Sequence, residues 1–230
     1  MHRAVNKYFF KHWSRDMAYV LGFFAADGYM WKSGRGAYFF GFQINDKKLL
    51  ENIRTALCST HKIAKRNRRN KKPQWGESYR LQIGSVEMYE DLLHLGMTPI
   101  KSNTLKFPKI PQQYFGDFIR GYFDGDGCVY YARLKFSDRK KSRRILNTQF
   151  ISGSSVFLST LHKQLKIHGI VGGTIRKKNA GFDLSLSFHD SLALYRIMYD
   201  TIPITSLFLH RKYKIFRKAI KGMYPHAGVA

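Results

Sequence analysis

The chain has 230 residues, which is enough for one large domain or two small ones with a buried core. Hydrophobic residues make up 44% of the sequence and aromatic residues 15%, so the composition excludes a disordered tail. Lys and Arg number 40 against 15 Asp and Glu, and the formal net charge of +25 indicates a polyanionic partner. DNA and RNA fit that charge equally well, and an anionic membrane surface is an alternative.

The two cysteines, Cys58 and Cys128, form no CxxC pair. Their number and spacing argue against a zinc site and a disulfide framework, and they favour a reducing environment. Residues 1–15 lack the apolar core of a signal peptide, and no apolar run approaches the ~18 residues of a membrane span. We therefore expect no membrane association and an intracellular protein, in the cytoplasm or nucleoid, or in an organelle if the organelle encodes it.

The first predicted element is a helix that belongs to an internal repeat. Residues 18–28 read AYVLGFFAADG, and residues 117–127 read DFIRGYFDGDG. Gly, two aromatic residues, a small or acidic residue, a small residue, Asp and Gly follow in the same register in both segments. A repeat of this length predicts two related halves.

The elements after the first motif are predicted from periodicity. Residues 38–45 alternate large apolar side chains with more polar or small ones, which indicates a half-buried strand. A helix over 47–57, a basic turn over 61–72, a strand over 78–84 and a helix over 86–95 complete the first half.

The elements after the second motif are similar. Hairpins are predicted over 129–135 with 144–151 and over 172–177 with 181–188, and helices over 155–168, 191–199 and 211–222. Each half thus has the order α-β-β-α-β-β-α, and the two-proline stretch 102–114 joins them. We expect an α+β protein divided into residues 1–105 and 106–230, with polar strand faces wide enough for a DNA groove.

Each motif reads as a helix that ends in Asp-Gly. We expect Gly28 and Gly127 to terminate the helices with positive φ. Asp27 and Asp126 then lie beside the negative end of a helix dipole, which is unfavourable for a carboxylate. The same exception at both places suggests that a bound divalent cation compensates it.

Small residues lie four positions apart in both motifs and share one helix face: Gly22 with Ala26, and Gly121 with Gly125. Two such faces can pack with their backbones very close, which brings the two motif carboxylates together. Paired carboxylates near a polyanion predict a Mg²⁺ site, because Mg²⁺ binds few protein ligands and retains water and phosphate oxygens. Such an ion can orient a water molecule and stabilise a leaving oxygen.

Residues 20–28 (VLGFFAADG) and 119–127 (IRGYFDGDG) resemble the signature of the LAGLIDADG homing endonucleases, in their single-chain form with two motifs. The sixth position departs from the signature in the first motif, where it is Ala25. In the second motif it is Asp124, which we expect to form hydrogen bonds at the helix end and not to bind a metal.

The resemblance implies two pseudo-symmetric halves that pack through two central motif helices and form a β-saddle over DNA. It implies a monomer that cleaves both strands of a long, asymmetric duplex site, leaving short 3′ overhangs. The expected metal is Mg²⁺, with Mn²⁺ or Ca²⁺ as substitutes for binding. An intron-encoded or free-standing origin is expected.

The resemblance also assigns site residues. Asp27 and Asp126 bind the metal together with the carbonyl groups of Ala26 and Gly125. Lys101 and Lys212 are expected near the scissile phosphates, with Arg211 as a competitor of Lys212. Asp46 matches a polar pocket position, and its counterpart in the second half is Ser154.

DNA contacts are expected from strands and basic loops, with loop charges on phosphates and strand residues on base edges. The alternative for each strand residue is a solvated face. The candidates are Lys32, Arg35, Gln43, Lys65, Arg66, Arg68, Arg69, Lys71, Lys72, Arg80, Gln82, Arg133, Lys135, Asn147, Gln149, Arg176, Lys177 and Lys178.

Three other functions fit the sequence. An RNA maturase of the same fold would assist intron splicing without cutting DNA, although retention of both motif carboxylates favours the nuclease. A non-cleaving DNA-binding regulator would not need both carboxylates. A general RNA-binding protein would leave the duplicated motif unexplained.

Overall fold

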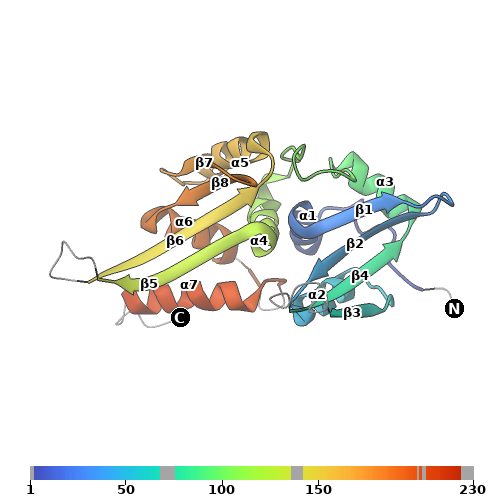
Figure 1. Ribbon diagram of the computed structural model, residues 1–230, viewed down its shortest axis with the longest axis horizontal. Helices are drawn as coiled ribbons and strands as arrows, with labels where there is room; N and C mark the ends of the chain where they lie inside the picture. The colour runs from blue at the N-terminus through green and yellow to red at the C-terminus, as the bar shows by residue number, and fades with distance from the viewer. Residues whose placement is uncertain (1–2, 68–75, 136–141, 201, 204–205, 224–230) are drawn as a thin grey trace.

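The computed structural model describes residues 3–67, 76–135, 142–200, 202–203 and 206–223. It is an α+β structure of two pseudo-symmetric halves, as predicted (Figure 1). Each half contains a four-stranded antiparallel sheet, with strand order β1-β2-β4-β3 in the first and β5-β6-β8-β7 in the second. The two orders are equivalent, so the halves share one topology.

The first half begins with the motif helix and alternates helices with strand pairs. Its elements are α1 (Arg15–Asp27), β1 (Gly28–Lys32), β2 (Tyr38–Ile44), α2 (Lys47–Ala56), β3 (Ile63–Asn67), β4 (Glu77–Gly84) and α3 (Val86–His94). The basic turn expected over 61–72 is wrong in part, because β3 lies within it and pairs with β4. As an edge strand, β3 carries charged residues that conceal its strand pattern.

The second half repeats this order and adds a short 3-10 helix before it and an α-helix after it. Its elements are η1 (Gln112–Tyr114), α4 (Phe115–Asp126), β5 (Gly127–Leu134), β6 (Arg143–Ser152), α5 (Ser155–Ile167), β7 (Thr174–Lys178), β8 (Gly181–Leu186), α6 (Phe188–Tyr199) and α7 (His210–Met223). Helix α7 has no counterpart among the described residues of the first half, and it packs beside β5.

The motif helices α1 and α4 pack against each other at the centre of the molecule (Figure 1). Glycine permits their close approach: a Cβ atom on Gly22 would overlap the backbone oxygen of Phe118, and one on Gly121 would overlap that of Tyr19. These contacts place the C-terminal ends of the two helices, and hence the two motif carboxylates, side by side.

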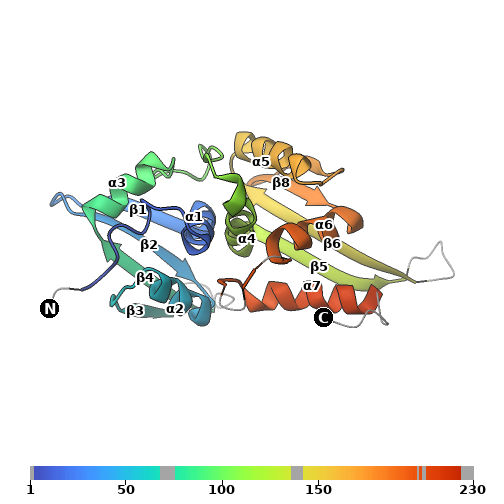
Figure 2. The same cartoon turned by 180° about the vertical axis from the view of Figure 1, so that it is seen from behind.

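The helices cover one face of each sheet. Phe40, Phe42, Leu81, Phe150 and Leu184 point toward the helices and are fully buried. Figure 2 shows α2, α5 and α6 in front of the strands, whereas Figure 1 shows the opposite faces of both sheets. None of the described helices has the length and apolar character needed to cross a membrane.

The expected positive φ at the ends of the motif helices is wrong. Gly28 has φ −76° and Gly127 has φ −97°, so the chain leaves each helix directly into an extended strand. Glycine is required for space instead, because a Cβ atom at Gly28 would collide with the ring of Phe24, and one at Gly127 with the ring of Phe123.

Candidate active site between the central helices

The two motif carboxylates lie at the adjoining ends of α1 and α4. The Asp27 carboxylate extends over the opposite motif, since a Cβ atom on Gly125 would lie 3.4 Å from Asp27 Oδ2. Burial raises the pKa of Asp27, and the charges of Lys212 and Lys101 oppose that rise. Burial and the neighbouring Asp27 charge raise the pKa of Asp126 to about 6. Without a cation, this site therefore disfavours two ionised carboxylates.

Lys101 closes the C-terminal end of α1. Its Nζ donates to the carbonyl oxygen of Gly28 at 2.6 Å and contacts that of Ala26 at 3.4 Å. The side chain is 7% exposed, and burial lowers its pKa. An ammonium group at this place neutralises the negative end of the helix dipole.

Lys212 performs the same task at the end of α4. Its Nζ donates to the carbonyl oxygens of Gly127 at 2.5 Å, Phe123 at 2.6 Å and Asp124 at 2.9 Å, and contacts that of Gly125 at 3.5 Å. Burial lowers the pKa of Lys212 to about 8. The sequence suggested that a metal ion compensates the negative helix ends. Two lysines of the chain supply part of that positive charge.

The charges are arranged crosswise between the halves. Lys212 is the leading positive charge acting on Asp27, and Lys101 is the leading positive charge acting on Asp126. We call Asp27, Gly125 and Lys212 centre A. Asp126, Ala26 and Lys101, related to them by the pseudo-symmetry of the halves, form centre B.

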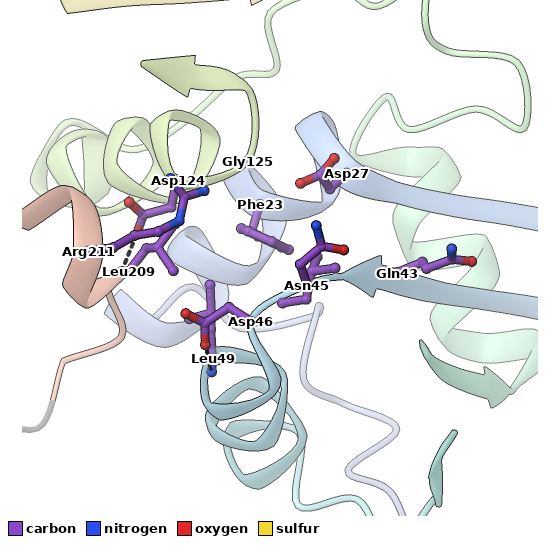
Figure 3. A pocket seen from close by; sticks show the side chains of 11 residues that line it. Phe23, Asp27, Gln43, Asn45, Asp46, Leu49, Asp124, Gly125, Leu209 and Arg211 are labelled. Carbon is purple, nitrogen blue, oxygen red and sulfur yellow. Dashed lines mark hydrogen bonds between the residues drawn. The ribbon is translucent and has the colours of Figure 1, made fainter. Parts of the chain in front are cut away.

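A polar cavity of about 240 Å³ opens at centre A. Asp27, Arg211, Asn45 and Asp46 line it, and Figure 3 shows them around a common space. Lys212 is buried against the helix end, so Arg211 is the cation of this pair that lines the cavity. Arg211 and Lys212 therefore do not compete for one place.

Asp46 and Ser154 have a structural role that the family resemblance did not indicate. Asp46 Oδ1 accepts a hydrogen bond from the backbone N–H of Leu49 at 2.9 Å, and Ser154 Oγ accepts one from that of Phe157 at 3.2 Å. Both residues therefore cap the N-terminus of the first helix after the long strand of their half. Asp46 also lines the cavity, so it is both a helix cap and a residue of the cavity wall.

The donor atoms at the helix ends fit a hard divalent cation. In the part of the chain that the structure describes, no hydrogen bond or ion pair reaches the carboxylates of Asp27 and Asp126. The carbonyl oxygens of Ala26 and Gly125 receive only the long lysine contacts of 3.4 and 3.5 Å. The described residues contain no group of three His, Cys, Asp or Glu side chains that could hold a metal, so water and phosphate oxygens would complete its coordination.

Several predicted DNA-contacting residues share the sheet faces that the helices leave uncovered. Gln43 pairs directly with Arg80 across β2 and β4, and Gln82 follows Arg80 on the same face. Asn147 and Gln149 occupy the corresponding face of β6. Arg66 is exposed on β3, opposite Ser78, and Arg176 lies on β7, opposite Asp183.

Several candidates have partners in the protein, including Gln43, whose Nε2 donates to Ser78 Oγ at 3.3 Å. Lys65 forms an ion pair with Glu77 at 2.6 Å, and Lys178 forms one with Asp183 at 3.4 Å. Lys32 Nζ lies 4.9 Å from the ring centre of Tyr38. Arg133 donates to Ser142 Oγ, whereas Arg35, Lys135 and Lys177 are exposed. The candidates outside the described residues are Arg68, Arg69, Lys71 and Lys72.

Residues 14–95 match the family model of the LAGLIDADG-like domain. Residues 14–95 are therefore a LAGLIDADG-like domain. Its motif helix, its sheet and the helices α2 and α3 all lie within the matched residues. No curated protein sequence matches the chain.

Solved structures resemble the whole chain and not only this LAGLIDADG-like half. I-SmaMI bound to uncleaved DNA target in the presence of calcium ions has a TM-score of 0.59 at 13% identity, and the match covers 93% of each chain. I-WcaI bound to its DNA recognition sequence has a TM-score of 0.60 at 16% identity over 91% of each chain. The I-LtrWI LAGLIDADG homing endonuclease has a TM-score of 0.59 at 11% identity, covering 96% of this chain and 92% of that one. These matches show that both halves have the LAGLIDADG fold.

The sequence analysis did not identify an aromatic row in the LAGLIDADG-like half. Tyr29, Trp31 and Phe39 stack in succession, with ring centres 5.5 and 5.0 Å apart, on the face of the sheet that also carries Arg80 and Gln82. Strand aromatics are typical core residues, and only the register of β1 against β2 reveals that these three lie outside the core.

Asn45, which lines the cavity of centre A, was not predicted as a site residue either. It follows a strand, and in the sequence it resembles an ordinary turn residue.

Proposed function

We propose that the chain is a metal-dependent, site-specific endonuclease for double-stranded DNA. The observation that carries the proposal is the pair of unpartnered carboxylates, Asp27 and Asp126, at the adjoining ends of the central helices. Their raised pKa values indicate a site that favours a cation, and the lysines of centres A and B lie beside them. Proteins of the same fold have been solved on DNA targets.

We further propose Mg²⁺ as the metal, held by Asp27, Asp126 and the carbonyl oxygens of Ala26 and Gly125, with Mn²⁺ or Ca²⁺ able to replace it for binding. The I-SmaMI structure contains calcium ions together with its uncleaved target. When bound, the ion would orient the attacking water molecule and stabilise the leaving oxygen.

The lysines and Arg211 would act on the phosphate groups. The ammonium groups of Lys101 and Lys212 are fixed by helix carbonyls, so each presents a positive charge that needs no reorganisation when negative charge develops on a scissile phosphate. Arg211 lines the cavity of centre A and would bind a phosphate oxygen or position a water molecule there.

The uncovered sheet faces would bind the duplex. Gln43, Arg80 and Gln82 would read base edges in one half of the target, and Asn147 and Gln149 in the other. The two faces carry different side chains, which favours a long asymmetric site. One chain supplies both carboxylates, so the proposed enzyme acts as a monomer, cutting both strands near the centre of the site and leaving short 3′ overhangs.

The test is cleavage of a randomised duplex library in the presence of Mg²⁺, followed by sequencing of the cut ends. The native chain is compared with Asp27→Asn and Asp126→Asn. Glu90→Gln is the matched control, because it removes an exposed carboxylate from α3, away from the helix ends.

The expected result is cutting within one long sequence by the native chain and the control, and loss of cutting by both aspartate variants. Tight duplex binding without cutting by the native chain would refute the nuclease and favour a DNA-binding regulator. Absence of both activities, together with intron-RNA splicing, would favour a maturase.

A further inference from the structure

Arg120 is a buried cation that belongs to neither centre A nor centre B. It lies in α4, is 1% exposed and is paired with Asp117 at 2.6 Å. Its Nε donates to the carbonyl oxygen of Leu207 at 2.9 Å, and its Nη1 donates to that of Met198 at 2.7 Å. Burial of a charge is costly unless such bonds satisfy it, so this guanidinium holds the segment before α7 against α4.

Asp124 holds the same segment at a second point. Its Oδ2 accepts a hydrogen bond from the backbone N–H of Leu209 at 2.7 Å, drawn in Figure 3, and one from the Tyr19 hydroxyl at 2.7 Å. The carboxylate is 2% exposed. Arg120 and Asp124 therefore fix the backbone on both sides of residue 208.

This attachment leads directly to Lys212. The carbonyl oxygen of Leu209 accepts hydrogen bonds from the backbone N–H groups of Lys212 at 3.0 Å and Tyr213 at 3.2 Å, which begin α7. The Lys212 side chain then returns to the end of α4. The position of its ammonium group thus depends on the two residues of α4 that hold the preceding segment.

Centre B has no such device. The positions that match Arg120 and Asp124 in the first motif are Leu21 and Ala25, which are apolar. Lys101 is held by a backbone turn, in which its carbonyl oxygen accepts hydrogen bonds from the N–H groups of Thr104 at 3.1 Å and Leu105 at 2.8 Å. Loss of the α4 attachment would therefore affect centre A and leave centre B intact.

We propose that Arg120 and Asp124 are positioning residues that place Lys212 in centre A and thereby govern cleavage of one DNA strand. The inference rests on the proposed nuclease function and assigns one DNA strand to each of centres A and B. Arg120 and Asp124 act through Lys212 and do not touch DNA.

The test uses the full chain and a duplex that contains its target, with a different fluorophore on each strand. The single-turnover rate of each strand is measured for the native chain, Asp124→Ala, Asp124→Asn, Arg120→Lys, Lys212→Ala and Lys101→Ala. Asp124→Ala removes the acceptor for Leu209, whereas Asp124→Asn keeps an oxygen there and should rescue the native rates. Tyr19→Phe is the matched control, because it removes the other hydrogen bond to Asp124 and keeps the one to the segment before α7.

Asp124→Ala and Arg120→Lys should slow one strand by roughly ten- to hundred-fold relative to the other, the range expected for a misplaced catalytic group. Lys212→Ala should slow the same strand, Lys101→Ala should slow the opposite one, and nicked duplex should accumulate. Adding Asp124→Ala to Lys212→Ala should leave the strand ratio unchanged.

Equal slowing of both strands by Asp124→Ala and Arg120→Lys would overturn the positioning role, because a loss of folding lowers both rates together. Native rates for both strands in these two variants would also overturn it. If Asp124→Ala does not fold, Arg120→Lys decides the outcome, because it keeps a charged side chain in place and is expected to slow one strand. Failure of the native chain to cut either strand would overturn the nuclease and this inference with it, a result distinct from cutting with an unaltered ratio.

Discussion

The ammonium group of Lys212 lies 2.5 Å from the carbonyl oxygen of Gly127, the first residue after the helix that ends in Asp126. A side chain from α7 thus closes the end of a central helix. Lys101 and Gly28 form the same relationship in the first half at 2.6 Å. Each carboxylate therefore has near it a positive charge that the protein itself holds in place.

Replacement of Asp126 by Asn should stabilise the metal-free protein at neutral pH. The pKa of Asp126 is raised from 3.8 to about 6, so the folded state binds this proton more tightly than the unfolded state. Its contribution to stability is present below pH 4 and is lost as the pH rises through about 6. Asp126→Asn removes this loss, which we expect to be about 1–2 kcal/mol after allowance for partial exposure.

Thermal denaturation at pH 5 and pH 8, with EDTA or with Mg²⁺, measures this effect. The Tm of Asp126→Asn should exceed that of the native chain most at pH 8 with EDTA, and Mg²⁺ should raise the Tm of the native chain only. A lower Tm for Asp126→Asn under metal-free conditions would contradict the unfavourable charge.

Gly22→Ala should destabilise the protein by about 2 kcal/mol or more, because overpacking at this backbone contact must separate the central helices. The added Cβ atom would overlap the carbonyl oxygen of Phe118. Urea denaturation measures the free energy of unfolding. Gly34→Ala is the control, since a Cβ atom there meets nothing within 4 Å. Equal stability of the two variants would disprove the close approach of the helices.

Arg80→Ala should relax sequence preference at one position of the target and cost about 1–3 kcal/mol of binding free energy. Lys177→Ala should weaken binding to all duplexes alike and lower the slope of log K against log salt by about 1. Both effects are measured by fluorescence anisotropy at several salt concentrations. Lys65→Ala is the control, because Glu77 already pairs with this lysine. An equal loss of affinity for all duplexes in Arg80→Ala would show that Arg80 contacts a phosphate and not a base.

Trp31 should report duplex binding by its fluorescence, because it lies in the aromatic row on the uncovered face of the first sheet. The measurement uses a chain in which Trp13 and Trp75 are replaced by Phe. In a matched chain that keeps only Trp13, which stacks on Tyr114 with ring centres 6.2 Å apart, the signal should stay constant. An unaltered Trp31 signal at saturating DNA would show that the duplex does not reach β1.

The repeated motif was sufficient to predict the fold class and the pseudo-symmetry, because its spacing fixes two helices and the halves that follow them. The alternation along the long strands also predicted which of their residues share one face. The ends of the motif helices were mispredicted, since the conformation of Gly28 is set by the ring of Phe24 and by the strand that follows. The sequence alone does not show whether the usual positive φ of a glycine at a helix end or the contacts with Phe24 and the following strand decide the conformation.

The buried attachment of α7 was beyond prediction for a different reason. Arg120 bonds to Leu207 and Met198, which are 87 and 78 residues away, and both partners use backbone carbonyl groups that every residue possesses. An arginine in a helix is normally exposed, so only the packed structure shows that this one is not. Lys101 and Lys212 were proposed as site residues from the family resemblance, whereas their bonds to the helix ends depend on how the chain packs.

The reach of Asp27 over Gly125 means that neither half possesses a whole centre A. Two separately expressed fragments, divided in the stretch between α3 and α4, would each hold one carboxylate and one lysine. Each fragment alone would be inert, and any activity recovered on mixing them would be proportional to the number of reassembled pairs. The pairing of the central helices would then act as an AND gate, giving a signal only where both fragments are present together.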